Sequence, residues 1–136
     1  MRVIWQKVLR KEGGIDMISK SKRKLVYDKY NGRCAYCGCE LKLSEMQVDH
    51  IVPKFRNNEM WHQNEIGSDE ISNLNPSCRM CNYYKKMGSI ENFRENLKDT
   101  LVRNVQRPFD FRLAERYGMV EVREWDGKFY FEKVEK

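Results

Sequence analysis

The chain has 136 residues, of which 40% are hydrophobic and 34% charged, and its formal net charge is +6. This length suits one compact domain and is too short for two large independent ones. Charged residues interrupt every apolar run, so no segment reaches the roughly 18 apolar residues of a membrane-spanning helix. The first residues also lack the features of a secretory signal. We therefore expect a cytoplasmic protein with no membrane partner.

Positive charge is concentrated in the N-terminal part of the chain. Residues 1–33 carry ten Lys and Arg against three Asp and Glu, whereas residues 34–136 carry sixteen against seventeen. A concentrated basic segment favours nucleic acid as a partner, because neutralising phosphates releases condensed counterions. A solvated basic helix that only aids solubility is the alternative.

Two helices are predicted before the first cysteine. A short amphipathic helix is expected within residues 1–12, before a Gly-Gly pair. A second should run from Ser19 or Ser21 to Tyr30, with the basic string SKSKRK on its polar side and Gly32 placed to end it. Short strands and turns should follow, and the polar stretch FRNNEMWHQNEIGSDE is predicted to be a surface loop. His62 in that stretch suits a surface or packing role.

The C-terminal half reads as two helices and a hairpin. A short helix is expected from Cys78 to Met87. After Ser89, a suitable N-cap, apolar residues recur at spacings of three and four and predict an amphipathic helix to near Val105. Residues 119–134 alternate apolar and charged side chains on both sides of an Asp-Gly pair, which predicts a β-hairpin.

The five cysteines argue for metal binding, because disulfides are rare in a reducing compartment. Four of them form two CxxC pairs with forty residues between them, Cys34–Cys37 and Cys78–Cys81. A closed tetrahedral zinc site needs four such ligands, and one tight turn can present both sulfurs of a pair. The sequence therefore predicts structural Zn²⁺ on these residues, with redox use of CxxC as the main alternative. Cys39 is expected to be a small buried residue or a thiol near the ligands.

Polar residues suited to proton and metal chemistry lie between and just after the cysteine pairs. They are Asp49–His50 in VDHIVP, Asn73 in SNL, and Asn82 and Lys85 in CNYYK. In isolation, a histidine beside an aspartate is more often a hydrogen-bonded structural pair. Together with the cysteine frame, however, the string resembles the HNH endonucleases, in the zinc-containing form often found in bacteriophages. The three motif residues make this an HNN variant.

The resemblance covers roughly residues 20–136 and implies a fold. We expect an α+β structure with a ββα-metal (HNH) core and a four-cysteine zinc site, joined by an N-terminal basic helix, a C-terminal amphipathic helix and the terminal hairpin. Residues 1–18 would be an appendage, 19–105 the nuclease domain, and 106–136 a C-terminal extension packed on it.

The resemblance also implies metal-dependent hydrolysis of DNA. His50 would be the general base, since a neutral imidazole suits cellular pH. Asp49 and Asn82 would bind the catalytic ion, Mg²⁺ or Mn²⁺, which prefers oxygen ligands. Asn73 would brace the hairpin that carries His50. Neighbours on a straight strand point to opposite faces, so Asp49 and His50 cannot both enter one site if the strand continues straight. Pro53 and the turn before it suggest that the strand ends there.

Basic side chains on both sides of the motif are candidates for phosphate contacts. They are Lys20, Lys22, Arg23, Lys24, Arg79 and Lys85. A phage terminase or other packaging protein is a further partner that the resemblance implies. The alternative function is a non-catalytic, zinc-stabilised DNA-binding module that keeps the HNH scaffold. Only the nuclease requires all of Asp49, His50 and Asn82.

Overall fold

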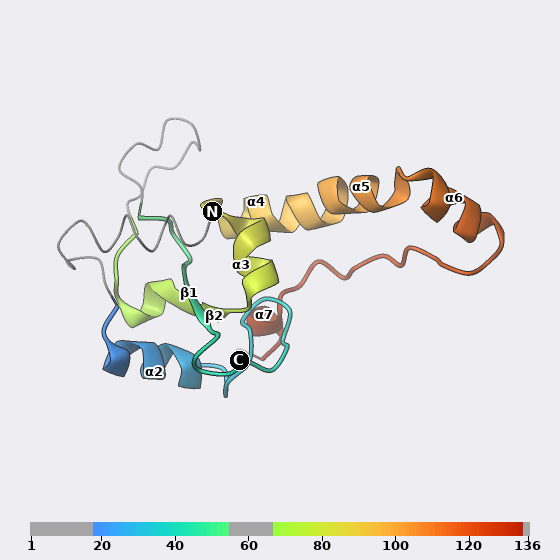
Figure 1. Ribbon diagram of the computed structural model, residues 1–136. Coiled ribbons are helices and arrows are strands. Elements are labelled where there is room, and N and C mark those ends of the chain that lie inside the picture. Colours follow the sequence, from blue (N-terminus) through green and yellow to red (C-terminus); the bar gives the residue numbers. More distant parts are fainter. Residues whose placement is uncertain (1–17, 55–66, 135–136) are drawn as a thin grey trace.

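The computed structural model describes residues 18–54 and 67–134 (Figure 1). The helix expected within residues 1–12 and the part of the polar loop that holds His62 lie outside these ranges. Among the described residues, no helix has the length and apolar character needed to cross a bilayer.

A small antiparallel sheet followed by a helix forms the centre of the fold. Strand β1 (Gln47–His50) pairs with β2 (Leu74–Ser77), and α3 (Arg79–Lys85) begins directly after β2. Pro76 has no backbone N–H to donate. It is tolerated in β2 because the sheet has only two strands, so β2 is an edge strand. The carbonyl of Pro76 instead accepts a hydrogen bond from the Ala35 N–H, at 2.8 Å. The predicted α+β class with a ββα unit is confirmed.

Helix α2 (Lys20–Asp28) covers one side of this unit. Ser19 caps it by accepting a hydrogen bond from the Lys22 N–H, so of the two predicted starts, Ser19 and Ser21, the first marks the boundary. Val26, on its apolar side, is fully buried against Met46 and Leu74. The chain then turns at Gly32, whose φ of +75° is readily available only to glycine.

A continuous helical stretch follows α3 and runs from Ile90 to Gln106. It consists of α4 (Ile90–Glu95), a π-helical segment η3 (Asn96–Leu101) and α5 (Val102–Gln106). Ser89 is its N-cap and accepts a hydrogen bond from the Asn92 N–H at 3.0 Å. The amphipathic helix predicted after Ser89 is therefore confirmed, although its π-helical part was not foreseen.

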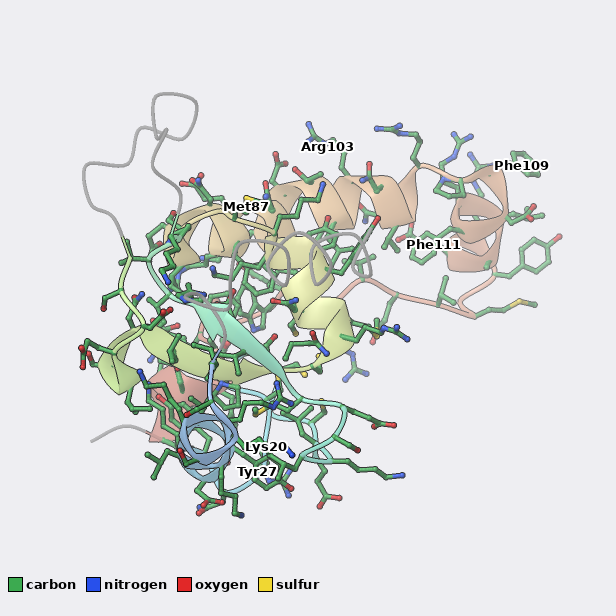
Figure 2. The ribbon with its side chains drawn as sticks, turned by 60° about the vertical axis from the view of Figure 1, so that its left-hand side comes forward. Lys20, Tyr27, Met87, Arg103, Phe109 and Phe111 are labelled. Carbon is green, nitrogen blue, oxygen red and sulfur yellow. The ribbon has the colours of Figure 1, made fainter. Side chains whose placement is uncertain are left out.

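One further helix, α6 (Phe109–Arg116), was not predicted. Pro108 follows the preceding helix and is the N-cap of α6. Its fixed φ suits the position before a first helical turn. The helices α5 and α6 extend away from the sheet (Figure 1), and Figure 2 shows Phe109 and Phe111 at the far end of this arm from Lys20 and Tyr27 of α2.

The predicted C-terminal β-hairpin is wrong. Residues 120–126 have no regular secondary structure, and a short helix, α7 (Tyr130–Val134), stands where the second strand was expected. The Asp-Gly turn itself is present, since the Lys128 N–H donates to Asp126 Oδ1 at 3.0 Å. The chain after the turn pairs with another segment, because the Tyr130 N–H donates to the Tyr36 carbonyl at 3.0 Å.

An aromatic cluster explains why the C-terminal segment returns to the core. Phe129 is 1% exposed and stacks on Phe93 of α4 with ring centroids 5.0 Å apart. Both rings make T-shaped contacts with the ring of Tyr36, and in each pair the ring centroids are 5.3 Å apart. Within residues 119–134, Trp125, Phe129 and Phe131 pack in this cluster, whereas Met119, Val120 and Val134 are exposed, so the alternating pattern does not mark one buried face of a strand.

Candidate functional site

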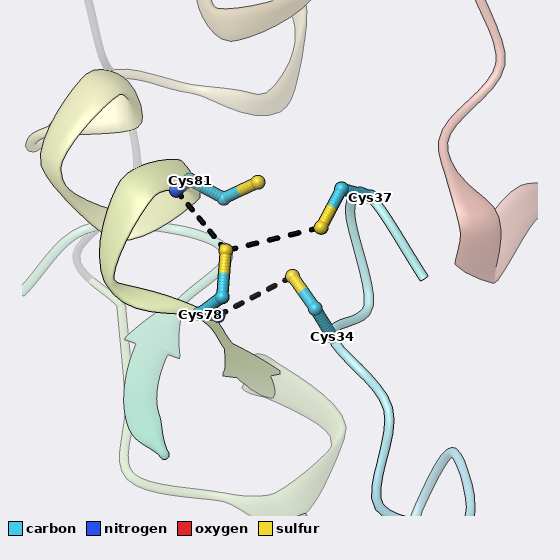
Figure 3. A group of neighbouring side chains, drawn as sticks. All are labelled: Cys34, Cys37, Cys78 and Cys81. Carbon is cyan, nitrogen blue, oxygen red and sulfur yellow. Dashed lines mark hydrogen bonds between the residues drawn. The ribbon is translucent and has the colours of Figure 1, made fainter. Parts of the chain in front are cut away.

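Four cysteine sulfurs converge where the turn formed by residues 34–37, the cysteine turn, meets the start of helix α3 (Figure 3). Cys34 and Cys37 lie on the turn, Cys78 is the N-cap of α3 and Cys81 lies in its first turn (Figure 3). All four sulfurs lie within 4.8 Å of one another, and those of Cys37 and Cys78 are 3.8 Å apart. A tetrahedral ion with metal–sulfur bonds of about 2.3 Å places its ligands about 3.8 Å apart. The predicted four-cysteine group is confirmed and has the dimensions of a structural metal site.

The surroundings of these sulfurs favour negative charge on Cys34 but oppose it on Cys37 and Cys81. The backbone N–H of Cys78 donates to Cys34 Sγ and that of Cys81 donates to Cys78 Sγ, both at 3.3 Å (Figure 3). Hydrogen bonds from Cys37 and Cys81 hold the pKa of Cys34 far below its usual range. Hydrogen bonding to Cys34 in turn raises the pKa of both Cys37 and Cys81. Clustered thiols cannot all ionise without a cation, so the group suits a bound divalent metal.

Cys39 lies outside this group. It was expected to be buried or to lie near the ligands, and the structure shows an exposed side chain. The prediction that Cys39 is buried is therefore wrong. Desolvation and the thiol of Cys37 raise the pKa of Cys39, so it is a neighbour of the site and not one of its four members.

Asp49 points into the protein from the middle of the motif. It is 4% exposed, and one of its oxygens accepts a hydrogen bond from the Tyr36 hydroxyl. The Lys85 ammonium lies 3.2 Å from Oδ2 and 3.3 Å from Oδ1 of the same carboxylate. Burial raises the pKa of Asp49, and the charge of Lys85 opposes that shift. Burial and the charge of Asp49 raise the pKa of Tyr36, so its hydroxyl keeps the proton that it donates.

The expected role of Lys85 in binding phosphate needs correction. Its side chain comes from the last turn of α3 and is 3% exposed, so it cannot reach a ligand on the surface. Besides Asp49, its ammonium binds the carbonyl oxygen of His50 at 3.1 Å. A buried carboxylate needs a cation nearby, and Lys85 supplies one.

The same arrangement shows how a divalent ion would fit. Asn82 is half-buried and precedes Lys85 by three residues on α3, so both project from the same side of a helix that packs on β1. The Lys85 ammonium already demonstrates that a cation is stabilised between Asp49 and the His50 carbonyl. Carboxylate, carbonyl and amide oxygens are the donors that Mg²⁺ and Mn²⁺ take. An ion bound by Asp49 and Asn82 would compete with Lys85 for this carboxylate.

His50 ends strand β1 and lies on its other face. Strand β1 stops at His50, as the following proline suggested, yet Asp49 and His50 still point to opposite sides. The imidazole is partly exposed, and its Nε2 lies 2.7 Å from Oδ1 of Asp69. Burial raises the pKa of Asp69, but hydrogen bonds from His50 and Lys54 outweigh it and lower the pKa overall. The structure therefore brings His50 beside a carboxylate other than the one expected.

Asn73 fastens the two ends of the loop between the strands. Its Oδ1 accepts a hydrogen bond from the Val52 N–H at 2.8 Å, and its Nδ2 donates to the carbonyls of Val52 at 3.1 Å and Ser68 at 2.8 Å. The side chain thus bonds to backbone groups shortly after His50 and to Ser68, which precedes the short 3-10 turn before β2. Such contacts are what a bracing role requires.

The predicted phosphate-binding residues on α2 differ in their surroundings. Lys20 is exposed, and Lys24 is exposed while paired with Asp28 at 2.9 Å. Lys22 donates to the Asp69 carbonyl at 2.6 Å, and Arg23 donates to the carbonyls of Leu43 and Met46. Lys22 and Arg23 therefore hold the fold together as well as adding charge. Arg79, at the start of α3, is exposed.

Sequence reasoning missed two residues of the site, Tyr36 and Asp69. Tyr36 lies inside the first CxxC pair, where only the cysteines attracted attention. Asp69 lies in a polar stretch that reads as a loop, and no local pattern separates it from the other acidic residues there. Both act through partners distant in sequence.

The Lys85 contact generates a test of the cation site. Lys85→Met keeps the length of the side chain and removes its charge, leaving Asp49 as a buried carboxylate without a cation. In buffer free of Mg²⁺ and Mn²⁺, the free energy of unfolding should fall by about 3–5 kcal/mol, and added Mn²⁺ should recover part of it. Urea unfolding with and without Mn²⁺ measures both effects. Lys86→Met, at the exposed neighbour, is the control. Loss of stability that Mn²⁺ does not recover would contradict ion binding at Asp49.

Comparison with known proteins agrees with this geometry. Residues 34–87 match the family model described as HNH endonuclease. A search of curated proteins gave no match. Among solved structures, the chain is similar to the Type II-C Cas9 enzyme from Actinomyces naeslundii, with 20% identity over 90% of this chain. The chain spans 15% of that enzyme, and the TM-score of 0.46 is too low to support an argument. Residues 34–87, which hold both cysteine pairs and the Asp49–His50 motif, belong to the HNH endonuclease family.

Proposed function

We propose that the chain is a metal-dependent endonuclease or nickase that hydrolyses phosphodiester bonds in DNA, with His50 as the general base. The observation that carries this proposal is the placement of His50 at the end of β1, partly exposed and hydrogen-bonded to a carboxylate, next to the cation-binding carboxylate Asp49. The family match over residues 34–87 supports the same chemistry.

Phosphodiester hydrolysis needs an activated water molecule and stabilisation of the negative charge that develops on the leaving oxygen. His50 takes a proton from water, and the resulting hydroxide attacks phosphorus, leaving 5′-phosphate and 3′-hydroxyl ends. A divalent ion held by Asp49 and Asn82, Mg²⁺ or Mn²⁺, supplies Lewis-acid stabilisation when bound. Asn73 keeps the backbone after His50 in place through its bonds to Val52.

The four cysteines hold a structural Zn²⁺ in this proposal. Zinc is favoured by the all-sulfur ligand set and by sulfur spacings that suit a tetrahedral ion. Exposed Lys20, Lys24 and Arg79 contact DNA phosphates, with Lys22 and Arg23 adding charge from partly buried positions. These contacts position the substrate without reading its sequence.

The cellular setting rests on the resemblance to phage proteins alone. In this proposal the protein is encoded by a bacteriophage, acts in the host cytoplasm and works with a terminase or another packaging protein.

One observation favours the alternative, a non-catalytic DNA-binding module on the same scaffold. Asp49 and His50 face opposite sides of β1, and Lys85 already neutralises Asp49. Without an exchange of Lys85 for a divalent ion, the fold would be stable but inactive. Incubation of supercoiled plasmid with Mg²⁺, Mn²⁺ or EDTA separates the two functions, because only the nuclease converts it to nicked or linear DNA.

Removal of zinc is expected to unfold the ββα unit. Cys81→Ser removes a ligand from α3, so zinc content should fall to below one ion per chain and the thermal transition should be lost or much lowered. Elemental analysis and circular dichroism measure the two quantities. Cys39→Ser, outside the four-thiol group, is the matched control and should keep both. Protein that is purified without chelator and contains no zinc would contradict the proposed site.

Replacement of the general base is expected to separate chemistry from binding. His50→Ala should leave zinc content, folding and DNA affinity nearly unchanged, while the rate of plasmid cleavage falls by about 10²-fold or more, the usual cost of losing a general base. His62→Ala removes the chain's other histidine and should cleave at the parent rate. Equal rates for His50→Ala and the parent protein, under matched metal and salt, would show that His50 is a structural residue.

A further inference from the structure

The carboxylate of Asp69 is hydrogen-bonded to the imidazole of His50, the reactive group of the proposed mechanism. Its Oδ1 is 2.7 Å from Nε2 of His50, and the two residues are nineteen positions apart in sequence. An ionised carboxylate can only accept hydrogen bonds. The neighbouring Lys54 ammonium, 2.6 Å from Oδ2, favours the ionised form. The Nε2 atom therefore carries the ring proton and donates it to Asp69, which leaves Nδ1 with the lone pair.

The backbone that carries Asp69 is fastened at several points. The Lys22 ammonium donates to the carbonyl of Asp69 itself at 2.6 Å, and Asn73 donates to the carbonyl of the preceding residue, Ser68, at 2.8 Å. The Gly67 N–H donates to the Pro53 carbonyl at 2.9 Å. A Cβ on Gly67 would overlap the backbone carbonyl of Val52, so only glycine permits this close approach.

These contacts join Asp69 to the segment that follows His50. Pro53 and Lys54 lie three and four residues after the histidine, and both bond to residues 67–69. The carboxylate is thus held from two sides: Lys54 binds its second oxygen, and Lys22 and Asn73 hold its backbone. A carboxylate fixed in this way can hold an imidazole ring in one orientation, whereas an exposed flexible one could not.

We propose that Asp69 is the positioning residue for His50: by accepting the Nε2–H hydrogen bond, it fixes the ring and its tautomer so that Nδ1 faces the attacking water. This inference rests on the proposed nuclease function. In the reaction, a water O–H bond breaks, the proton bonds to Nδ1, and the hydroxide attacks phosphorus. The bond from phosphorus to the 3′ oxygen breaks, and that oxygen leaves with the bonding electron pair and takes up a proton from solvent. Asp69 keeps its own charge throughout and stabilises the imidazolium that forms. Asp69 touches neither DNA nor the divalent ion in this role.

The test compares two variants of Asp69 with a matched neighbour. Asp69→Asn preserves shape but removes the charge and allows a wrong tautomer, and Asp69→Ala removes the acceptor. Glu70→Gln, the adjacent exposed carboxylate, is the control. At saturating plasmid, both Asp69 variants should lose at least about 10-fold in kcat. KM, DNA affinity and zinc content should stay near those of the parent, because Asp69 acts only through the orientation of His50.

A second readout does not depend on cleavage. The hydrogen-bonded ring N–H of His50 should give a slowly exchanging proton resonance in ¹H–¹⁵N spectra, identified by its loss in His50→Gln. It should persist in Glu70→Gln and disappear in Asp69→Ala, whose folding is checked by zinc content and thermal unfolding. The same resonance in Asp69→Ala would overturn the assigned bond.

The two proposals fail in different ways. A parent protein that does not cleave DNA with any divalent metal would overturn the nuclease function, whatever the resonance shows. A parent that cleaves, together with an Asp69→Asn variant that cleaves equally fast, would overturn the positioning role alone.

Discussion

The hydroxyl of Tyr36 donates a hydrogen bond to the carboxylate of Asp49, and through this bond the cysteine turn meets the strand that carries the motif. Tyr36 lies between Cys34 and Cys37, so the metal-binding turn fixes its backbone. Its ring is 3% exposed and makes T-shaped contacts with Phe93 and Phe129, which fixes the direction of the hydroxyl. One residue therefore joins the metal site, the aromatic core and the buried carboxylate.

Helix α3 makes the same connection from the other side. It begins at Cys78 and carries Cys81, Asn82 and Lys85 within two turns. Adjacent residues on a helix point about 100° apart, so Cys81 can face the sulfurs while Asn82 and Lys85 face β1. A metal on the cysteines would then hold both the strand and the helix of the ββα unit at fixed distances. In the proposed nuclease, an ion that takes no part in the reaction would thus set the geometry of the residues that do.

The parts of the structure that the sequence predicted correctly depend on short spacings. The CxxC pairs, the start of α2 near Ser19 and the cap Ser89 can be read from residues a few positions apart, because turn and helix geometry are local. The ββα order was implied by the family resemblance. The bracing role of Asn73 was implied by the family resemblance, and its contacts with Val52 and Ser68 suit that role.

The parts that sequence reasoning could not predict depend on tertiary contacts. The contact of Lys85 with Asp49 joins residues thirty-six positions apart in sequence, and the Asp69–His50 hydrogen bond joins residues nineteen positions apart. The false hairpin has the same origin. Alternating apolar residues around Asp126–Gly127 suit a strand, yet the aromatic core offers Phe129 and Phe131 a buried place that a two-stranded surface ribbon could not.

The most direct test of this account is Tyr36→Phe, which keeps the ring in the aromatic core and removes only the hydroxyl that reaches Asp49. The measurement is single-turnover plasmid cleavage at saturating protein, with zinc content and DNA affinity determined on the same samples. If the cysteine turn positions Asp49 through this hydroxyl, zinc content and affinity should stay at the parent values while the cleavage rate falls by at least about 10-fold. A Tyr36→Phe protein that cleaves at the parent rate would contradict the coupling between the metal site and the motif.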